Sequence, residues 1–168
     1  MKSMAQIKED KLIGAMGEGR TDEFYMLRCI AMAKQADPFP NPAVGCVIVK
    51  DGRIVGEGFH KKAGEPHAEI NALHIAEQRS ESVEGATLFC SLEPCFHFGR
   101  TPPCVDAVIK AKVGKVIISA LDPNPLTHGK SVEKLRENGI IVVEGVLQIE
   151  GKKLIKKFAG QFDGSFLK

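Results

Sequence analysis

Apolar residues recur along the chain in two patterns, short β-branched runs and longer segments with helical spacing. The first helical segment is predicted from about residue 22 to residue 36, with Thr21 or Asp22 as its N-cap. Its expected buried face is formed by residues three or four apart, namely Phe24, Leu27, Ile30, Ala31 and Lys34. Residues 37–42 contain three prolines, which remove backbone donors and favour extended conformations, so a loop is expected there.

Two β-branched runs follow, over residues 44–49 and 54–59. They are separated by Asp51-Gly52, the pair that most strongly indicates a tight hairpin turn. We therefore expect these two strands to pair in antiparallel fashion.

The second half of the chain alternates between helical and strand patterns. Helices are predicted over about 67–80, from Pro102 through Ile109, over 131–138 and over 148–158, and strands over 86–91, 116–120 and 140–144. Such alternation favours parallel strands with helices packed on both faces. The predicted fold is an α/β protein, a three-layer α/β/α sandwich around a mixed sheet of five strands.

The 168 residues suit one domain, and no internal repeat or second domain is evident. Residues 1–21 show no clear period and are expected to form an N-terminal arm, with a single domain over 22–168. A formal net charge of +2 gives no reason to expect a nucleic-acid partner. The chain has no apolar run long enough to span a bilayer and no secretion signal, so no membrane association is expected.

Five cysteines at irregular spacing do not suggest a disulfide framework. They fit a reducing, cytoplasmic environment. Three of them, Cys29, Cys46 and Cys90, lie on apolar faces or in a strand and are interpreted as core residues.

The chemistry concentrates between Pro66 and Cys104. His67, Cys95 and Cys104 are the types of ligand that zinc prefers, and three protein ligands leave the fourth position open, as in a catalytic site. Each of these residues falls at the end of a predicted strand or the start of a predicted helix, where ligands gather in α/β sheets. Glu69, two residues after His67, is placed to act as a proton shuttle rather than as a ligand.

Two simpler interpretations compete with this one. Each of the three residues, taken singly, is more often structural, the cysteines as buried thiols and His67 as a surface histidine. A purely structural zinc is the second alternative, and it would usually take a fourth protein ligand, for which His97 is the candidate. The combination of His67, Glu69 and the Pro94-Cys95 pair with Cys104 favours a catalytic zinc ion, Zn2+.

These motifs resemble the cytidine deaminase superfamily. The stretch from Leu92 to Cys104, Leu-Glu-Pro-Cys-x-His-x-Gly-Arg-Thr-Pro-Pro-Cys, is most similar to the pyrimidine deaminase domain of riboflavin biosynthesis. In bacteria this domain is usually the N-terminal half of a bifunctional deaminase/reductase. Further matching segments are Asn41-Pro42-x-Val44-Gly45, Gly56-x-Gly58-x-His60, residues 63–69 and Asp122-Pro123-Asn124-Pro125. The resemblance covers about residues 22–158.

The resemblance implies a cytidine deaminase-like fold and hydrolytic deamination of 2,5-diamino-6-ribosylamino-4(3H)-pyrimidinone 5′-phosphate. The products would be 5-amino-6-(5-phosphoribosylamino)uracil and ammonia. By the same resemblance, His67, Cys95 and Cys104 bind zinc and Glu69 is catalytic. A phosphorylated pyrimidine is the expected small-molecule partner, and a homo-oligomer and a separate reductase are the two protein partners that the resemblance allows. The given residues contain no nicotinamide-binding fingerprint, so no reductase activity is expected of them, and the chain is expected to be either a stand-alone deaminase or a fragment of a bifunctional enzyme.

Substrate contacts are expected from six polar residues. Arg100 and His60 are candidates for the phosphate, because a guanidinium offers a planar fork of donors. Asn41 can donate and accept at the edge of a pyrimidine ring, and Asp122 and Asn124 can bind ribose hydroxyls. Thr101 completes the set, as part of the Gly99-Arg100-Thr101 segment. For Asn41, Asp122 and Asn124 the alternative role is turn formation next to proline.

The sequence departs from the family at Phe96 and Phe98, where small or polar residues or histidine are common, which affects the pocket wall rather than the ligands. The sequence also allows two other functions. One is deamination of another base, such as cytosine, guanine or an adenosine in transfer RNA, against which the Gly-Arg-Thr-Pro-Pro insert counts. The other is a zinc-stabilised binding domain without catalysis, against which Glu69 counts.

Overall fold

The computed structural model describes residues 19–99 and 101–162. The expected N-terminal arm therefore lies almost entirely outside the described residues. The described elements, in chain order, are α2 (Asp22–Ala33), β1 (Gly45–Lys50), β2 (Arg53–Phe59), α3 (Ala68–Gln78), β3 (Thr87–Leu92), α4 (Cys104–Lys110), β4 (Lys115–Ala120), α5 (Lys130–Glu137), β5 (Ile141–Glu144), α6 (Gln148–Leu154) and α7 (Lys156–Ala159).

The strands form one mixed sheet in the order β2-β1-β3-β4-β5. β1 pairs antiparallel with both β2 and β3, whereas β3, β4 and β5 run parallel. Asp51 and Gly52 both adopt positive φ, at 49° and 74°, as the tight turn between β1 and β2 requires. The predicted hairpin and the predicted parallel half are thus both confirmed.

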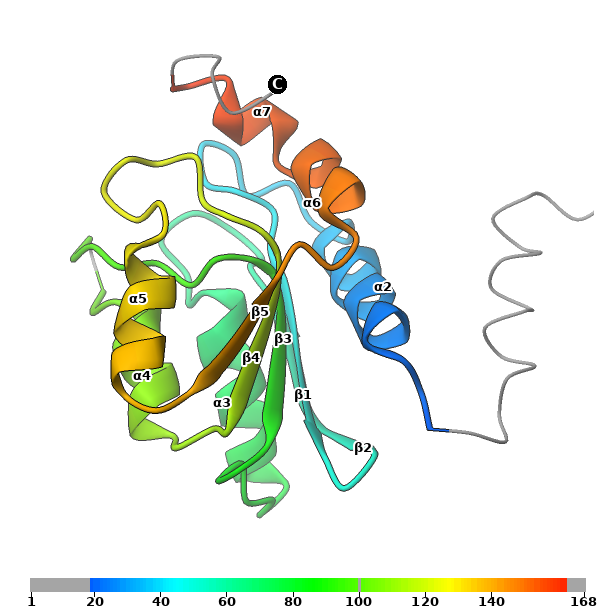
Figure 1. Cartoon of the computed structure of the whole chain (residues 1–168). Coiled ribbons are helices and arrows are strands. Elements are labelled where there is room, and N and C mark those ends of the chain that lie inside the picture. The colour runs from blue at the N-terminus through cyan, green and yellow to red at the C-terminus, as the bar shows by residue number, and fades with distance from the viewer. Residues whose placement is uncertain (1–18, 100, 163–168) are drawn as a thin grey trace, which may run out of the picture.

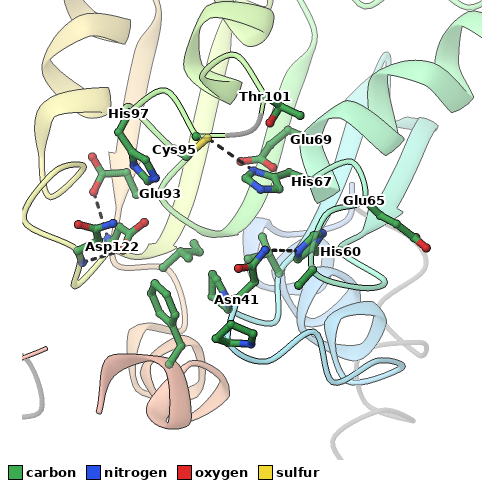
Figure 2. Close-up of a pocket in the computed structure, with 18 of the residues that line it drawn as sticks. Asn41, His60, Glu65, His67, Glu69, Glu93, Cys95, His97, Thr101 and Asp122 are labelled. Carbon is green, nitrogen blue, oxygen red and sulfur yellow. Dashed lines mark hydrogen bonds between the residues drawn. The ribbon is translucent and has the colours of Figure 1, made fainter. Parts of the chain in front are cut away.

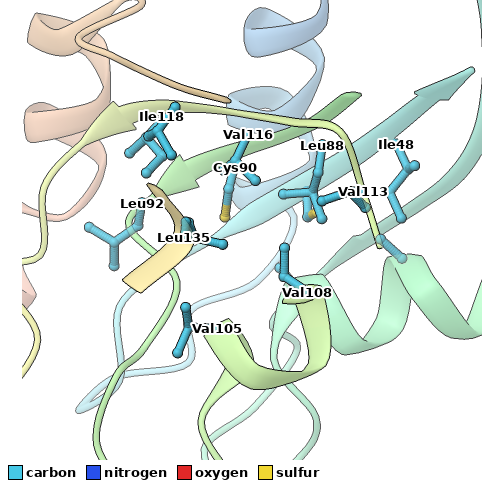
Figure 3. Packing of buried hydrophobic residues seen from close by; sticks show 14 of the residues in the cluster. Ile48, Leu88, Cys90, Leu92, Val105, Val108, Val113, Val116, Ile118 and Leu135 are labelled. Atoms are coloured by element: carbon cyan, nitrogen blue, oxygen red, sulfur yellow. The ribbon is translucent and has the colours of Figure 1, made fainter. Parts of the chain in front are cut away.

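Helices cover both faces of the sheet, which confirms the layered fold (Figure 1). α3, α4 and α5 lie on one face, where their apolar side chains pack against alternate residues of the central strands, among them Ile48, Leu88, Cys90 and Ile118 (Figure 3). α2 covers the other face through a second cluster that includes Met26, Val47, Phe89 and Ile117. Cys29, Cys46 and Cys90 are fully buried in these two clusters, as expected.

The predicted buried face of α2 is wrong in part. Leu27 is 38% exposed and Ala31 is exposed, whereas Met26, Cys29 and Ala33 are buried. The predicted face and the face that is buried have similar apolar content. Which of the two is buried therefore depends on the side of the helix that packs on the sheet. Thr21, rather than Asp22, is the N-cap, since its hydroxyl accepts a hydrogen bond from Phe24 N at 3.2 Å.

Other helix boundaries differ from the predicted ones by a few residues. α2 ends at Ala33 rather than near residue 36, and Pro102 and Pro103 precede α4 rather than forming its first turn. The single helix expected over 148–158 is divided into α6 and α7 at Ile155, which is buried. Within the described part of the chain, no helix is both long and apolar enough to cross a membrane.

Two glycines of β2 allow α3 to approach the sheet closely. A Cβ at Gly56 would lie 2.3 Å from the backbone oxygen of Ala72, and one at Gly58 would lie 2.7 Å from Ala72 N. The facing residues of α3, Ala68 and Ala72, are small and fully buried. This close packing fixes the start of α3, and with it the residues that precede and open the helix.

Candidate active site

Three ends of secondary-structure elements meet at one end of the sheet, beyond the last residues of the central strand β3. His67 is the N-cap of α3, Cys95 lies in the loop that follows β3, and Cys104 is the first residue of α4. One ligand atom from each residue lies within 4.8 Å of the others, so the three could hold a metal ion. The expectation that these element ends converge therefore agrees with the geometry.

The donor atoms are in direct contact. Nδ1 of His67 lies 3.2 Å from Sγ of Cys104 and 3.6 Å from Sγ of Cys95. Cys104 N donates to Sγ of Cys95 at 3.1 Å, so the backbone at the start of α4 already stabilises negative charge on that sulfur. An imidazole and two sulfurs at these separations match the donor set of a zinc site.

The ionisation of the two cysteines also fits a divalent cation. Hydrogen bonding from Cys104, together with His67, holds the pKa of Cys95 well below that of an ordinary thiol, which favours the thiolate. The pKa of Cys104 is raised, because the Cys95 sulfur and burial both oppose a second negative charge. A bound cation relieves this opposition, since the thiolate is the form that binds metal.

Glu69 lies in the first turn of α3, two residues after His67, and its side chain is buried. Figure 2 shows its carboxylate beside His67 and close to Cys95. Burial raises the pKa of Glu69 above its ordinary value, and the charge of the nearby Cys95 adds to this effect. A buried carboxyl group beside a metal-binding cluster can accept and return a proton.

The cluster opens into a cavity of about 520 Å³, the size expected of a small-molecule site. His67, Glu69 and Cys95 line one part of it, and most of the predicted substrate-binding residues line the remainder (Figure 2). These are Asn41, His60, Thr101, Asp122 and Asn124. The last expected residue, Arg100, lies outside the described residues.

His60 does not have the environment expected of a phosphate-binding cation. Its side chain is buried, and its two ring nitrogens contact Asn41 Nδ2 at 3.0 Å and the carbonyl oxygen of Pro66 at 3.1 Å. Burial lowers the pKa of His60, which favours the neutral ring. A neutral imidazole with both nitrogens engaged supports Asn41 instead of contributing positive charge.

Sequence reasoning missed Glu93, which organises the loop on the opposite side of the cavity. Its carboxylate accepts hydrogen bonds from three backbone N–H groups, those of Asp122 at 3.1 Å, Gly129 at 3.0 Å and Ser131 at 3.1 Å. The side chain is buried, and its only local signal was its place two residues before Cys95 in the metal motif. Glu93 therefore ties the metal-binding loop to the loop that carries Asp122 and Asn124.

Within that second loop, Asp122 and Asn124 fold the backbone and also line the cavity. Oδ1 of Asp122 accepts from Asn124 N at 2.8 Å, and Oδ1 of Asn124 accepts from Leu126 N at 3.0 Å. Burial raises the pKa of Asp122 to about 7. The predicted turn chemistry is thus present, and the same side chains remain available to a ligand in the cavity.

His97 is not a member of the metal-binding cluster. Its Nδ1 lies 3.1 Å from the hydroxyl of Thr127, and its side chain lines the cavity. The alternative of a structural zinc with His97 as fourth ligand therefore has no support in this geometry.

Comparison with known proteins agrees with the geometry. The chain is 51% identical over 139 residues to the riboflavin biosynthesis protein RibD of Aquifex aeolicus, an alignment that covers 82% of this chain and 38% of that protein. It is 52% identical over 139 residues to the diaminohydroxyphosphoribosylamino-pyrimidine deaminase of Buchnera aphidicola subsp. Schizaphis graminum, with 82% of this chain and 92% of that protein covered.

Among solved structures, the fold is similar to that of a diaminohydroxyphosphoribosylaminopyrimidine deaminase/5-amino-6-(5-phosphoribosylamino)uracil reductase from Thermotoga maritima. The TM-score is 0.78 with 50% sequence identity, over 81% of this chain and 39% of that chain. The chain thus spans about two-fifths of the length of the Aquifex and Thermotoga proteins and nearly all of the Buchnera protein. Residues 19–120, which include every candidate metal ligand, match the family described as the cytidine and deoxycytidylate deaminase zinc-binding region. This match extends over more than half of the sequence, and the chain therefore belongs to the zinc-dependent cytidine and deoxycytidylate deaminase family.

Proposed function

We propose that this chain catalyses the hydrolytic deamination of 2,5-diamino-6-ribosylamino-4(3H)-pyrimidinone 5′-phosphate to 5-amino-6-(5-phosphoribosylamino)uracil and ammonia, a step of riboflavin biosynthesis. One observation carries the proposal. The His67–Cys95–Cys104 cluster and the buried Glu69 adjoin a single cavity. The chain that forms this site is 52% identical to the Buchnera protein, which is named as a deaminase of this pyrimidine, over 92% of that protein.

We assign His67, Cys95 and Cys104 as the zinc ligands. Their donor atoms form a borderline-to-soft set within 4.8 Å of one another, and the pKa of the Cys95 thiol is lowered, which favours the form that binds metal. Zinc at such a site supplies Lewis acidity and lowers the pKa of a water molecule. The backbone N–H of Cys104 donates to the Cys95 sulfur and stabilises negative charge there, which favours the thiolate that a metal ion binds.

We assign Glu69 as the proton shuttle. In this role its carboxylate would transfer both protons of the attacking water in turn, the first to the ring nitrogen and the second to the amino group that leaves as ammonia. Its burial excludes bulk water, which would otherwise exchange with the transferred proton. The start of α3, fixed against β2 by Gly58, holds Glu69 at a constant offset from His67.

Substrate contacts follow from the cavity. Asn41 faces the ring with its free carbonyl oxygen, because its amide group is directed to His60. Asp122 and Asn124 meet the sugar hydroxyls, and Thr101 lines the rim. For the phosphate we keep Arg100, the candidate expected from the sequence, because its guanidinium offers a planar fork of donors.

The direct test is an ammonia-release assay on the diaminopyrimidinone ribotide, with cytidine, guanine and adenosine as controls. We expect turnover of the ribotide alone and one zinc ion per chain by metal analysis. Turnover of one of the control compounds in place of the ribotide would identify a deaminase of that compound. Zinc binding without turnover of any substrate would identify a zinc-stabilised binding domain.

We also propose the wider assignments that the family suggests. Residues 22–168 form a single deaminase domain, supported by the one continuous sheet. The cytoplasm is the proposed compartment, supported by five cysteines that are all free. A separate reductase is a proposed partner, because the Thermotoga relative is both a deaminase and a reductase by name. A homo-oligomer is proposed from the family resemblance alone. Sedimentation of the purified protein and a coupled reductase assay test these two partners.

A further inference from the structure

The C-terminal segment after α6 forms part of the cavity wall. Phe158, in α7, and Gln161, just beyond it, line the same cavity as His67 and Asn41. Figure 2 shows the red C-terminal helix at the end of the cavity remote from His67 and Cys95. Both residues lie well beyond residue 120, where the match to the zinc-binding region ends.

Three contacts hold this segment against the proline-rich loop that carries Asn41. Nε2 of Gln161 donates to the carbonyl oxygen of Pro40 at 2.8 Å. Nζ of Lys157 lies 3.1 Å from Oδ2 of Asp37 and 4.4 Å from the ring centroid of Phe39. The ion pair is exposed and contributes little by itself, but together the contacts fix where the segment meets the cavity.

The two lining side chains present complementary chemistry. Nε2 of Gln161 also donates to the carbonyl oxygen of Phe158, at 3.2 Å, so both of its hydrogens are committed. The side chain then offers its carbonyl oxygen as an acceptor. The ring of Phe158 is partly buried and packs edge-to-face on Phe162, with the centroids 5.3 Å apart. An aromatic surface beside a hydrogen-bond acceptor suits a sugar, which has apolar C–H faces and donor hydroxyls.

We propose that Phe158 and Gln161 form a wall that binds the ribosyl part of the substrate. This inference rests on the proposed function. The amino-bearing ring carbon must lie at the metal cluster, so the sugar of a ribosylated pyrimidine extends toward the remote end of the cavity. The wall therefore makes the protein selective for the ribosylated ring over the free ring, and it has no part in the chemical step.

The experiment compares Gln161→Ala and Phe158→Leu with wild type, with Lys156→Ala as the control. Lys156 is exposed on α7 and lies outside the cavity lining. The readouts are KM and kcat for the ribotide, zinc content, and the inhibition constant of the sugar-free triaminopyrimidinone ring as a competitor. Loss of one hydrogen bond predicts a rise in KM of about 5-fold for Gln161→Ala, with kcat and zinc content unchanged. Phe158→Leu keeps apolar volume and should raise KM by about 3- to 10-fold.

The inhibition constant of the free ring separates the proposal from its alternatives. We expect it to stay within about 2-fold of wild type in both variants, since the free ring makes no contact with the wall. An unchanged KM for the ribotide overturns the inference and leaves the proposed function intact. An equal weakening of ribotide and free ring also overturns it, because the segment then acts only by supporting the Asn41 loop. Absence of ribotide turnover in wild type overturns the proposed function, and the inference with it.

Discussion

Nδ2 of Asn41 donates a hydrogen bond to Nε2 of His60 across 3.0 Å (Figure 2). The direction follows from the other side of the ring, where Nδ1 of His60 lies 3.1 Å from the carbonyl oxygen of Pro66, which can only accept. Nδ1 therefore carries the proton and Nε2 is the acceptor. The buried imidazole thus orients the Asn41 amide and leaves its carbonyl oxygen for the cavity.

His60→Phe should impair substrate binding through Asn41. The Phe ring keeps much of the volume but cannot accept a hydrogen bond, so the Asn41 amide loses its fixed orientation. We expect KM for the ribotide to rise about 10-fold, which corresponds to the loss of one oriented, buried hydrogen bond, while zinc content is retained. His74→Phe, at an exposed position of α3, is the control and should behave as wild type. An unchanged KM would show that Asn41 is not oriented by His60.

Glu69→Gln should abolish turnover without loss of metal. The amide is nearly isosteric with the carboxylate but cannot take up and return a proton, so kcat should fall by about 10²- to 10⁴-fold. Ammonia release and zinc content, measured on the same preparation, check this prediction. A variant that deaminates at close to the wild-type rate would remove Glu69 from the mechanism.

Cys95→Ala should lose both zinc and activity. The substitution removes a sulfur that contacts His67 and accepts from Cys104 N, and two remaining protein ligands are too few for a stable zinc site. Treatment of wild type with a chelator should have the same effect, and activity should return when zinc is added back. Cys29→Ala, a change to a buried cysteine on the other face of the sheet, should keep its zinc.

Glu93→Gln should loosen the loop that carries Asp122 and Asn124. One carboxylate oxygen is replaced by an NH₂ group that faces backbone donors, so at least one of the three hydrogen bonds is lost, at a cost of about 1–3 kcal/mol in the free energy of unfolding. Hydrogen exchange should accelerate at the backbone N–H groups of Asp122, Gly129 and Ser131, which donate to this carboxylate. Unchanged protection of these amides would contradict the assigned role.

Asp122 gives the protein a specific pH dependence. Burial raises the pKa of its carboxyl group to about 7 in the folded state, so between the unfolded pKa and this value the folded state binds more protons than the unfolded state. The contribution of Asp122 to stability is therefore largest at acidic pH and declines as pH rises toward 7. Asn at this position keeps the acceptor for Asn124 N but does not titrate.

Urea unfolding of wild type and Asp122→Asn at pH 5 and pH 8 measures this effect. The variant should gain up to about 2 kcal/mol relative to wild type over this interval. A difference between the two proteins that does not change with pH would show that Asp122 titrates as an exposed carboxyl group.

The sequence by itself determined the elements and their order. β-branched runs, the Asp51-Gly52 turn and the prolines act over a few residues, so they specified the hairpin and the alternating second half without knowledge of the fold. The metal motif could also be identified from the sequence. One histidine and two cysteines at the ends of predicted elements are typical of a metal site and of few other roles, and these residues are His67, Cys95 and Cys104. Local patterns could not determine which face of α2 is buried, because two faces of the helix have similar apolar content.

Only the tertiary structure decided how distant side chains are used. The carboxylate of Glu93 meets N–H groups about 30 or more residues away, His60 becomes a neutral support for Asn41, and Phe158 and Gln161 reach the cavity from the C-terminal segment. None of these contacts is encoded by spacing along the chain. They depend on burial and on the approach of elements far apart in sequence, which arise only when the sheet and its two helical layers have assembled.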